Sequence, residues 1–339
     1  RDPMRLPILP RWRAHAGRAV AWFALAMLHA VPALAQPQRQ PEPLAEGVWL
    51  LPGSFDRGRQ PDGNSLLLQG RDGLVIVDSG RHADHAAALI AWAVERGQPL
   101  RAVINTHWHL DHLGGNIELR RFAPGLRAYG SIALREAVER RMPESEVELR
   151  GMLADPATDD QTRRMVEIDL ALYAGRANFL PDEHVDGPAH AVDIGGRRLR
   201  VGVERGVSGG DVWVFDQTSG VLAVGDFVTL PVPFFDTACP AQWQASMRRL
   251  EAIPFERVLP GHGPIMSRDE FKRYLGALDR LLSCAASDRT VAECSTGWIA
   301  DLGPLLPAAS QRSIAPMLGH YFEQRLRAPA IPQNRDCTP

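Results

Sequence analysis

The sequence has 339 residues and contains a single lysine, Lys272, so arginine supplies nearly all of its positive charge. The chain therefore lacks a P-loop lysine for nucleotide phosphates, and Lys272 lies in a charged helical stretch that does not favour Schiff-base chemistry. The formal net charge is −2, which offers no basic field for a phosphate backbone. These features exclude nucleic acid as an expected partner and favour a small-molecule substrate.

Long apolar runs are also lacking. The run Ala19–Leu28 is much shorter than the roughly 20 residues that a membrane-spanning helix needs. Arginines precede this run, and Pro32 and the small-residue pattern Ala33-Leu34-Ala35 follow it, which is typical of a secretory signal peptide. We therefore expect residues 1–35 to be a signal peptide cleaved near Ala35. The protein is then expected to be periplasmic or secreted, with no stable membrane span.

Cysteine is scarce, and none of the four cysteines forms a C-x-x-C pair or adjoins a histidine. In an oxidising compartment, Cys239, Cys284, Cys294 and Cys337 can form two disulfides with three possible connectivities. We favour Cys284 with Cys294, which flank a short polar stretch, and Cys239 with Cys337. The second bond would attach a C-terminal extension, residues 287–339, to the preceding domain.

The rest of the chain alternates between short β-runs and helical patterns. Residues 36–46 are rich in Pro and Gln and are expected to form a flexible leader before a domain at residues 47–286. Runs bounded by turn residues predict strands at residues 48–51, 65–68, 74–77, 101–105, 126–129, 192–194, 199–203, 212–215, 221–224 and 257–259. Helices are expected over residues 82–96, 114–122, 131–173, 239–253 and 269–286, with breaks at Pro143 and Pro156. Two successive sets of strands and helices predict an α/β fold in four layers, an αββα sandwich.

The densest cluster of metal-binding side chains follows the predicted strand at residues 101–105. The segment Thr106-His107-Trp108-His109-Leu110-Asp111-His112 contains three imidazoles and a carboxylate within six residues. In a tight turn at a strand end, His107 and His109 project to the same side, and Asp111 and His112 can converge from the loop. Zinc is bound by imidazole nitrogen and carboxylate oxygen at about 2 Å, so the cluster predicts a zinc site. Asp78, after an earlier strand, is expected to support the other nitrogen of a histidine.

This motif resembles the H-x-H-x-D-H signature of the metallo-β-lactamase superfamily, and the resemblance extends over residues 47–279. It includes Leu74–Gly80, Val221–Asp226 and Leu259–Gly263. The resemblance implies a four-layered αββα metallo-β-lactamase-like sandwich with two zinc ions at the strand ends. Transferred residue by residue, the implied ligands are His107 and His109 for the first zinc, Asp111, His112 and His262 for the second, and Asp226 bridging both.

One position departs from the family pattern. The stretch Arg205–Asp211 matches a turn whose histidine is a further ligand of the first zinc, but Val207 stands at that place. Valine has no lone pair to donate, so the first site loses a ligand, whereas the second keeps its full set. The chain is therefore expected to hold two zincs with the first bound weakly, to hold one zinc, or to have reduced activity.

The resemblance implies hydrolysis of an ester, thioester, lactone or lactam-type bond by a metal-bound hydroxide, with Asp111 or Asp226 orienting it or accepting a proton. A phosphodiesterase is disfavoured by the acidic charge and the export signal. The segment Pro231–Pro240, together with the C-terminal cysteines, resembles the quinoprotein relay system zinc metallohydrolases, which implies association with a pyrroloquinoline quinone-dependent oxidation system. The alternative is a periplasmic metal-binding accessory protein of such a system with little or no hydrolase activity.

Overall fold

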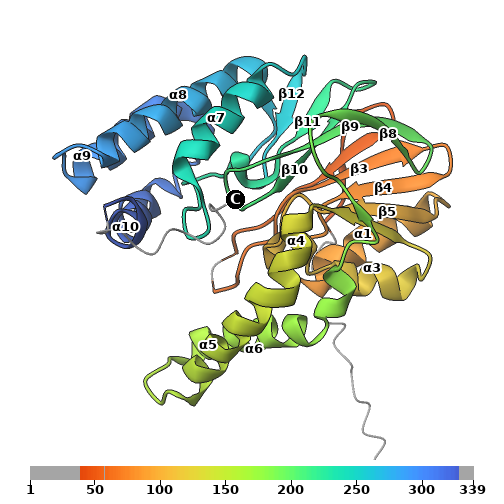
Figure 1. Cartoon of the computed structure of the whole chain (residues 1–339), viewed down its shortest axis with the longest axis horizontal. Helices are drawn as coiled ribbons and strands as arrows, with labels where there is room; N and C mark the ends of the chain where they lie inside the picture. Colours follow the sequence, from red (N-terminus) through yellow and green to blue (C-terminus); the bar gives the residue numbers. More distant parts are fainter. Residues whose placement is uncertain (1–38, 57, 328–339) are drawn as a thin grey trace, which may run out of the picture. The chain divides into compact units, whose positions relative to one another are not determined.

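Two β-sheets form the centre of the computed structural model, which describes residues 39–56 and 58–327 (Figure 1). The first sheet has seven strands in sequential order: β1 (Glu42–Ala45), β2 (Val48–Leu51), β3 (Ser65–Gly70), β4 (Gly73–Val77), β5 (Leu100–Ile104), β6 (Arg127–Gly130) and β7 (Glu183–His184). The second sheet has six strands in the order β13-β12-β11-β10-β9-β8, namely β8 (His190–Ile194), β9 (Arg197–Glu204), β10 (Asp211–Asp216), β11 (Val221–Ala223), β12 (Arg257–Leu259) and β13 (Met266–Ser267).

Strand direction decides where the carboxyl ends of the strands lie. Strands β1 to β4 pair antiparallel, whereas β4, β5, β6 and β7 pair parallel to one another. In the second sheet, β11 and β12 are parallel and the other pairs are antiparallel. Because parallel neighbours end at the same edge, the loops after β4 and β5 lie together, as do those after β11 and β12. A 2.7 Å hydrogen bond from the backbone N of Val212 to the carbonyl of Thr106 joins the two sheets at this edge.

Apolar side chains pack between the sheets and against their outer faces. Between the sheets, Val75 of the first and Val212 of the second belong to one buried cluster. Trp92 packs on the outer face of the first sheet, and Trp243 packs on that of the second. The covering helices are α1 (Ala83–Glu95) and α3 (Asn116–Phe122) on the first sheet, and α7 (Pro240–Glu251) and α8 (Arg268–Ala285) on the second. This arrangement confirms the predicted αββα fold.

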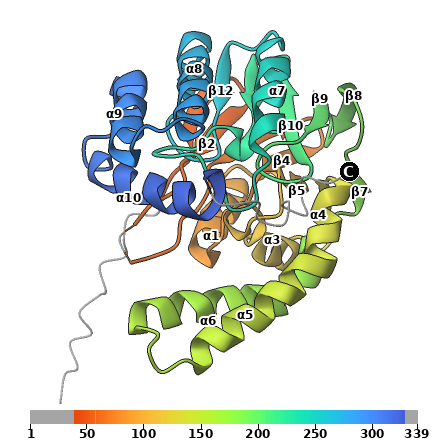
Figure 2. The same cartoon turned by 60° about the vertical axis from the view of Figure 1, so that its left-hand side comes forward.

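A helical segment separates the two halves of the chain. It consists of α4 (Ile132–Glu136), the π-helical turn η1 (Ala137–Arg141), α5 (Met142–Ala154), α6 (Asp160–Ala174) and the 3-10 turn η2 (Arg176–Phe179). Helices α5 and α6 lie side by side (Figure 2). The expected break at Pro156 is confirmed, since non-helical residues separate α5 from α6. The expected break at Pro143 is wrong, because Pro143 lies in the first turn of α5, where its missing N–H is tolerated after the π-turn.

Two helices that the sequence did not lead us to expect follow α8. They are α9 (Val291–Leu302) and α10 (Gln311–Tyr321), which end in the short turns η4 (Gly303–Leu305) and η5 (Phe322–Leu326). The disulfide between Cys284 and Cys294 joins α8 to α9, which confirms the favoured pairing. Cys239 is also disulfide-bonded. Its predicted partner, Cys337, lies outside the residues that the structure describes.

The beginning of the described chain corrects one expectation. Residues 42–45, within the expected flexible leader, pair with β2 as strand β1. The reason is apolar packing: Leu44 and Ala45 lie against the core between the sheets. The expected signal peptide, residues 1–35, lies outside the described residues. Among residues 39–56 and 58–327, no helix combines the length and the apolar character that crossing a membrane requires.

Candidate metal centre

The ends of parallel strands bring distant histidines and aspartates together. His107 follows β5, Asp226 lies in the 3-10 turn η3 (Gly225–Phe227) after β11, and His262 follows β12. Asp111 and His112 lie on the short helix α2 (Leu110–Leu113) beside the end of β5. All of these side chains are buried. Asp111 and His262 are in contact although they are 151 positions apart in the sequence.

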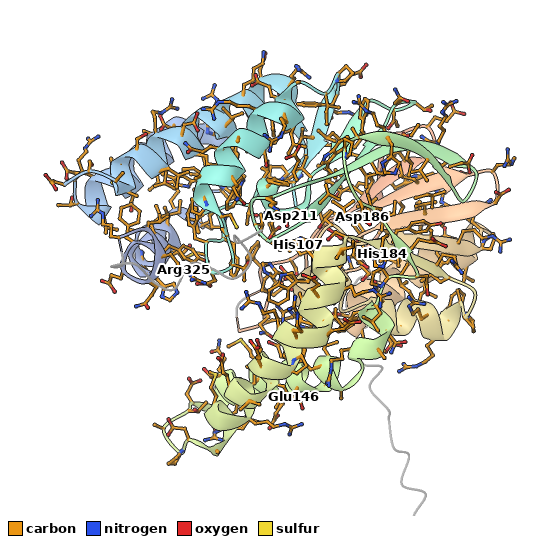
Figure 3. The ribbon with its side chains drawn as sticks, viewed as in Figure 1. His107, Glu146, His184, Asp186, Asp211 and Arg325 are labelled. Carbon is orange, nitrogen blue, oxygen red and sulfur yellow. A yellow bond between two sulfur atoms is a disulfide. The ribbon has the colours of Figure 1, made fainter. Side chains whose placement is uncertain are left out.

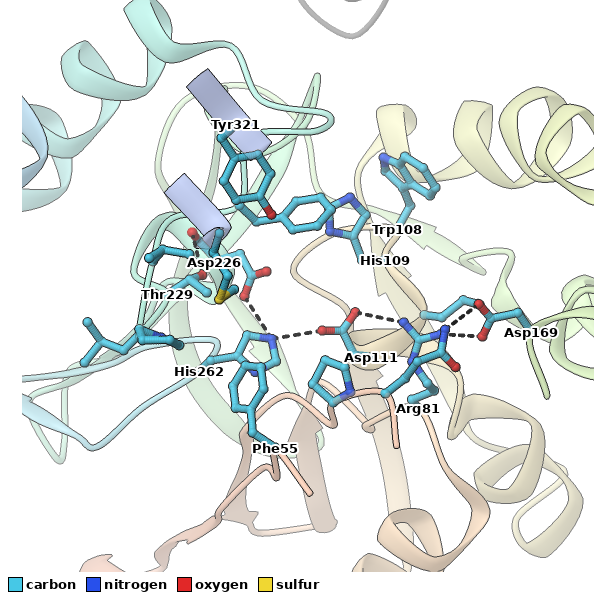
Figure 4. Close-up of a pocket in the computed structure, with 18 of the residues that line it drawn as sticks. Phe55, Arg81, Trp108, His109, Asp111, Asp169, Asp226, Thr229, His262 and Tyr321 are labelled. Carbon is cyan, nitrogen blue, oxygen red and sulfur yellow. Dashed lines mark hydrogen bonds and ion pairs between the residues drawn. The ribbon is translucent and has the colours of Figure 1, made fainter. Parts of the chain in front are cut away.

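Four of these side chains form what we call the four-residue group: Asp111, His112, Asp226 and His262. One ligand atom of each lies within 4.8 Å of the others. His262 Nε2 is 2.9 Å from Asp111 Oδ2, and His112 Nε2 is 3.1 Å from Asp226 Oδ1. The two remaining imidazole–carboxylate contacts are 3.6 Å long. Figure 4 shows His262 between the two carboxylates. A tetrahedral zinc site with bonds of about 2.0–2.2 Å separates its ligand atoms by about 3.3–3.6 Å, which is similar to this spacing.

Asp78 fixes the orientation of His112. Its Oδ2 lies 2.7 Å from His112 Nδ1 and also accepts a 2.8 Å hydrogen bond from Thr106 Oγ1. Because Nδ1 of His112 donates to this carboxylate, the Nε2 lone pair faces the rest of the four-residue group. Asp78 has a φ of 60°, a left-handed conformation that aspartate tolerates better than most residues. The prediction that Asp78 supports a histidine is therefore confirmed.

A second set of side chains, the three-residue group, consists of His107, His109 and Asp226. His107 Nε2 lies 2.9 Å from His109 Nδ1 and 3.8 Å from Asp226 Oδ2. Asp226 thus directs one oxygen to each group.

The neighbours of the two histidines fix their tautomers. Thr106 donates its hydroxyl proton to Asp78, so its oxygen accepts the proton of His107 Nδ1, at 3.0 Å. Thr237 donates its hydroxyl proton to a backbone carbonyl, so its oxygen accepts that of His109 Nε2, at 2.9 Å. His107 Nε2 and His109 Nδ1 therefore turn their lone pairs toward each other. Two facing lone pairs repel, and a bound cation relieves this repulsion.

Burial and neighbouring charges set the protonation of the site. Burial lowers the pKa of His109 to about 4 and that of His107 well below its usual value, so both rings are neutral at pH 7. Burial also opposes charge on His112, but the surrounding carboxylates, Asp226 first, outweigh it and raise the pKa of His112 well above its usual value. Burial opposes ionisation of Asp111 and Asp226, yet His112 holds the pKa of both carboxyls below the usual range. A metal ion in the four-residue group would replace the proton on His112.

Glycine and asparagine let the loops approach one another closely. A Cβ atom on Gly261 would lie 2.0 Å from Asp226 Oδ1, so a larger residue there would displace this carboxylate. Asn64 Nδ2 donates to the carbonyls of Pro260 and Gly263, both at 2.9 Å. These contacts hold the loop after β12 against the first sheet.

The loop after β9 keeps a fixed shape around Val207. The Asp211 carboxylate accepts hydrogen bonds of 2.7–3.1 Å from the backbone N atoms of Gly206, Val207 and Ser208 and from the Ser208 hydroxyl. The Val207 side chain is fully buried in the apolar cluster that includes Phe227. Figure 3 shows Asp211 and His107 in the interior of the molecule, whereas Glu146 lies away from them on α5. Within the described part of the chain, the three-residue group has no fourth metal-binding side chain.

The donor atoms of the site fit a divalent metal ion. His112 Nε2 and Asp226 Oδ1 are buried and lie 3.1 Å apart as an ion pair, and neither has a hydrogen-bond partner elsewhere among the described residues. A metal ion bound by both atoms would satisfy them in place of this ion pair. Imidazole nitrogens and carboxylate oxygens are zinc ligands, and the two groups supply four and three of them.

A cavity of about 350 Å³ opens beside the metal-binding groups (Figure 4). Sequence reasoning missed several of its walls. Arg81 lies in the loop after β4 and forms an ion pair with Asp169 of α6. Its Nη2 atom is 3.7 Å from Asp111 Oδ1. Tyr321 of α10 lines another side. The place of Arg81 just after Asp78-Ser79-Gly80 was a usable signal, and the helical run at residues 131–173 could be interpreted as a cap over the cleft, but nothing in the sequence linked α10 to the site.

Comparisons with known proteins agree with this geometry. A family model described as the metallo-beta-lactamase superfamily matches residues 58–262. A hydroxyacylglutathione hydrolase from Thermosynechococcus vestitus is 40% identical over 62 residues, which are 18% of this chain and 23% of that relative. The chain thus spans less than a quarter of the length of this curated relative.

Solved structures share the fold at low sequence identity. A metallo-beta-lactamase from Pontibacter korlensis superposes with a TM-score of 0.52 at 20% identity, covering 71% of this chain and 98% of that chain. The metallo-beta-lactamase FIM-1 from Pseudomonas aeruginosa, in its mono-zinc form, gives a TM-score of 0.52 at 17% identity, covering 72% and 98%. Since the family model matches more than half of the sequence, this chain belongs to the metallo-β-lactamase superfamily.

Proposed function

We propose that the chain is a zinc-dependent hydrolase that opens an ester, thioester, lactone or lactam-type bond in the cavity beside the four-residue group. A bound zinc ion would supply a water of lowered pKa and polarise the scissile carbonyl. Asp111 or Asp226, both ionised, would orient the attacking water or accept its proton. The partial relative named as a hydroxyacylglutathione hydrolase supports hydrolysis as the reaction class.

The four-residue group carries this proposal. Its imidazoles and carboxylates are buried around a common centre, and two of the facing atoms, His112 Nε2 and Asp226 Oδ1, have no hydrogen-bond partner outside the group among the described residues. Asp78 holds His112 from behind, which is the kind of outer contact that orients a metal ligand.

We infer further that the three-residue group binds a second zinc less tightly. It offers three donor side chains, and the loop position where the family has a histidine holds the buried side chain of Val207. Fewer protein donors leave more of the coordination to solvent, so the four-residue group should fill first.

The metal count and a substrate panel test the proposal together. Purified protein would be dialysed and its zinc measured by mass spectrometry, then assayed with a thioester, a lactone and a cephalosporin. We expect one tightly bound zinc and turnover that a chelator removes. The His112→Ala variant should lose that zinc and at least about a hundredfold in kcat/KM.

His190→Ala is the matched control, because His190 is an exposed histidine at the start of β8. It should keep both the zinc and the activity. A folded His112→Ala protein that retains wild-type turnover would contradict the proposal.

A second candidate function is a metal-binding accessory protein of a periplasmic quinoprotein oxidation system that uses pyrroloquinoline quinone. Val207 favours it, because loss of a metal ligand is compatible with loss of catalysis. Zinc bound without turnover of any substrate on the panel would support this candidate. Both candidates include export, which the apolar run at residues 19–28 and the Cys284–Cys294 disulfide support.

A further inference from the structure

The cavity beside the metal-binding groups has mainly aromatic and aliphatic walls. Five aromatic side chains line it, namely Phe55, Trp108, Tyr173, Phe234 and Tyr321. They come from separate parts of the chain: the loop after β2, the histidine motif, α6, the loop before α7, and α10. Phe55 is 56% exposed, and its ring lies 5.0 Å from that of His262, so an aromatic surface meets solvent beside a candidate ligand. A volume of about 350 Å³ suits a small organic molecule.

Arg81 is the single arginine or lysine among the described residues that line this cavity. Its side chain is 11% exposed and forms an ion pair with Asp169. Its other terminal nitrogen lies 3.7 Å from Asp111. Asp169 is held in turn by a 2.8 Å hydrogen bond from Gln60 Nε2. The positive charge of Arg81 is therefore already balanced by two carboxylates that belong to the protein (Figure 4).

A substrate with a carboxylate remote from its scissile bond would meet an unfavourable surface. Away from the metal-binding groups it would lose water on entering and find no unpaired cationic side chain among the described residues of the wall, and Asp169 would repel it. The faces of aromatic rings also carry partial negative charge. An uncharged apolar group would instead gain free energy from burial against the same rings.

We propose that this cavity selects uncharged acyl compounds with an apolar or aromatic group, and discriminates against those with a carboxylate remote from the scissile bond. This inference rests on the proposed hydrolase function and narrows its substrate class. Neutral esters and lactones fit it, whereas lactams and thioesters that carry free carboxylates do not.

Two esters that differ in one group provide the test. 4-Nitrophenyl hexanoate and the 4-nitrophenyl monoester of adipic acid share the leaving group and the chain length, and differ in a terminal methyl against a carboxylate. We expect kcat/KM of the zinc-loaded protein to favour the hexanoate by about ten- to a hundredfold, the usual effect of burying an unpaired polar group. Equal values, or a preference for the adipate, would overturn the inference.

Asp169→Asn tests the role of Arg81. Removing this negative charge leaves Arg81 available to an entering carboxylate, so the preference for the hexanoate should shrink by about tenfold, chiefly through faster adipate turnover. Glu167→Gln is the control, because Glu167 is an exposed acid on the same helix and does not line the cavity. The control should keep the wild-type preference. An unchanged preference in folded Asp169→Asn protein would contradict the assigned role of Arg81.

Binding of unreactive analogues separates this inference from the proposed function. Calorimetry with N-phenylhexanamide and the monoanilide of adipic acid needs no turnover. The neutral anilide should bind at least about tenfold more tightly. If zinc-loaded protein hydrolyses neither ester but shows this binding preference, the hydrolase proposal fails and the charge selectivity stands. Equal binding, or tighter binding of the acid, would overturn the selectivity even in an active enzyme.

Discussion

The two candidate metal-binding groups share Asp226, and they differ in how many other donors surround this carboxylate. In the four-residue group, Asp111, His112 and His262 approach one of its oxygens, and in the three-residue group two histidines approach the other. The loop that could add a further donor to the smaller group is well ordered by Asp211, yet it places a valine in the apolar core.

The same comparison shows that three of the four histidines have an outer hydrogen-bond partner, whereas Nδ1 of His262 is buried and has none among the described residues. His112 contacts Asp78 directly, and His107 reaches the same carboxylate through Thr106. His109 is held by Thr237. The groups thus differ in the number of donors, and both histidines of the smaller group have an outer partner, whereas only His112 of the larger group has one. A site of this kind can lose one ligand while the backbone around it remains in place.

The largest effect on zinc affinity is expected from Asp78→Asn, because Asp78 orients His112 directly and His107 through Thr106. Asparagine tolerates the left-handed conformation, but its amide has no charge and one acceptor oxygen. It cannot accept from the Thr106 backbone N while that oxygen accepts from His112 Nδ1 and Thr106 Oγ1. Zinc affinity of both groups should fall by about 10- to 100-fold, measured by competition with a chromophoric chelator. Asp72→Asn, at an exposed position in the β3–β4 turn, should change neither affinity. If the zinc affinity of only one group fell, the claim that both groups depend on Asp78 would be contradicted.

His85 is a buried histidine outside the two groups, and its protonation should make the free energy of unfolding depend on pH. His85 Nε2 lies 2.8 Å from Ser65 Oγ, and burial lowers the pKa of His85 to about 4. Since the unfolded chain takes up this proton near pH 6.5 and the folded chain near pH 4, stability must fall as the pH drops through this window. The contribution is about 3 kcal/mol at most.

Urea unfolding in the presence of a chelator measures this contribution. His85→Gln should lose less stability between pH 6.5 and 4 than the wild type does, whereas His184→Gln, at an exposed position, should follow the wild type. Identical pH dependence in all three proteins would show that His85 does not titrate as described.

Val207→His should give the three-residue group a fourth donor side chain, so that both groups have four. An imidazole buried among apolar side chains should destabilise the metal-free protein by about 2 kcal/mol. With zinc present, the variant should hold two ions per chain after dialysis that leaves the wild type with one. Val207→Ala is the control, because it disturbs the same packing without adding a donor. An unchanged metal count in the histidine variant would refute our account of this position.

The smallest effect is expected from Thr237→Val, which acts on one group alone. It removes the hydroxyl between His109 Nε2 and the Val207 carbonyl. Affinity at the three-residue group should fall by about tenfold while the four-residue group is unaffected. Thr296→Val, on the exposed side of α9, should change neither. Equal losses at both groups would show that Thr237 acts on the fold and not on His109.

The sequence predicted those parts of the molecule whose signals are local. Strand runs and helical spacing led to the αββα layers, and the motif at residues 106–112 placed four donors within one turn. Its assembly with Asp226 and His262 was implied by the resemblance to the metallo-β-lactamase superfamily, and in the structure it arises because parallel strands end at a common edge. Pro143 misled the analysis, since proline in the first turn of a helix leaves the helix intact.

The cavity walls could not be predicted, because they depend on how distant helices pack. Asp169 and Tyr321 belong to α6 and α10, and their neighbours in the sequence carry no metal-binding pattern. Thr290 and Glu293 form a capping box at the start of α9, a local signal that did not enter our sequence prediction. It could not indicate that the chain beyond this helix returns to the site.

Because one carboxylate serves both groups, the two occupancies are thermodynamically linked. Asp226 offers Oδ1 to the larger group and Oδ2 to the smaller, so an ion at either place changes the charge and freedom of the ligand that the other needs. If an ion in one group changes the zinc affinity of the other group by some factor, then an ion in the second group must change the zinc affinity of the first by the same factor. Zinc titrations of this protein should therefore be fitted with an interaction constant and not as two independent isotherms.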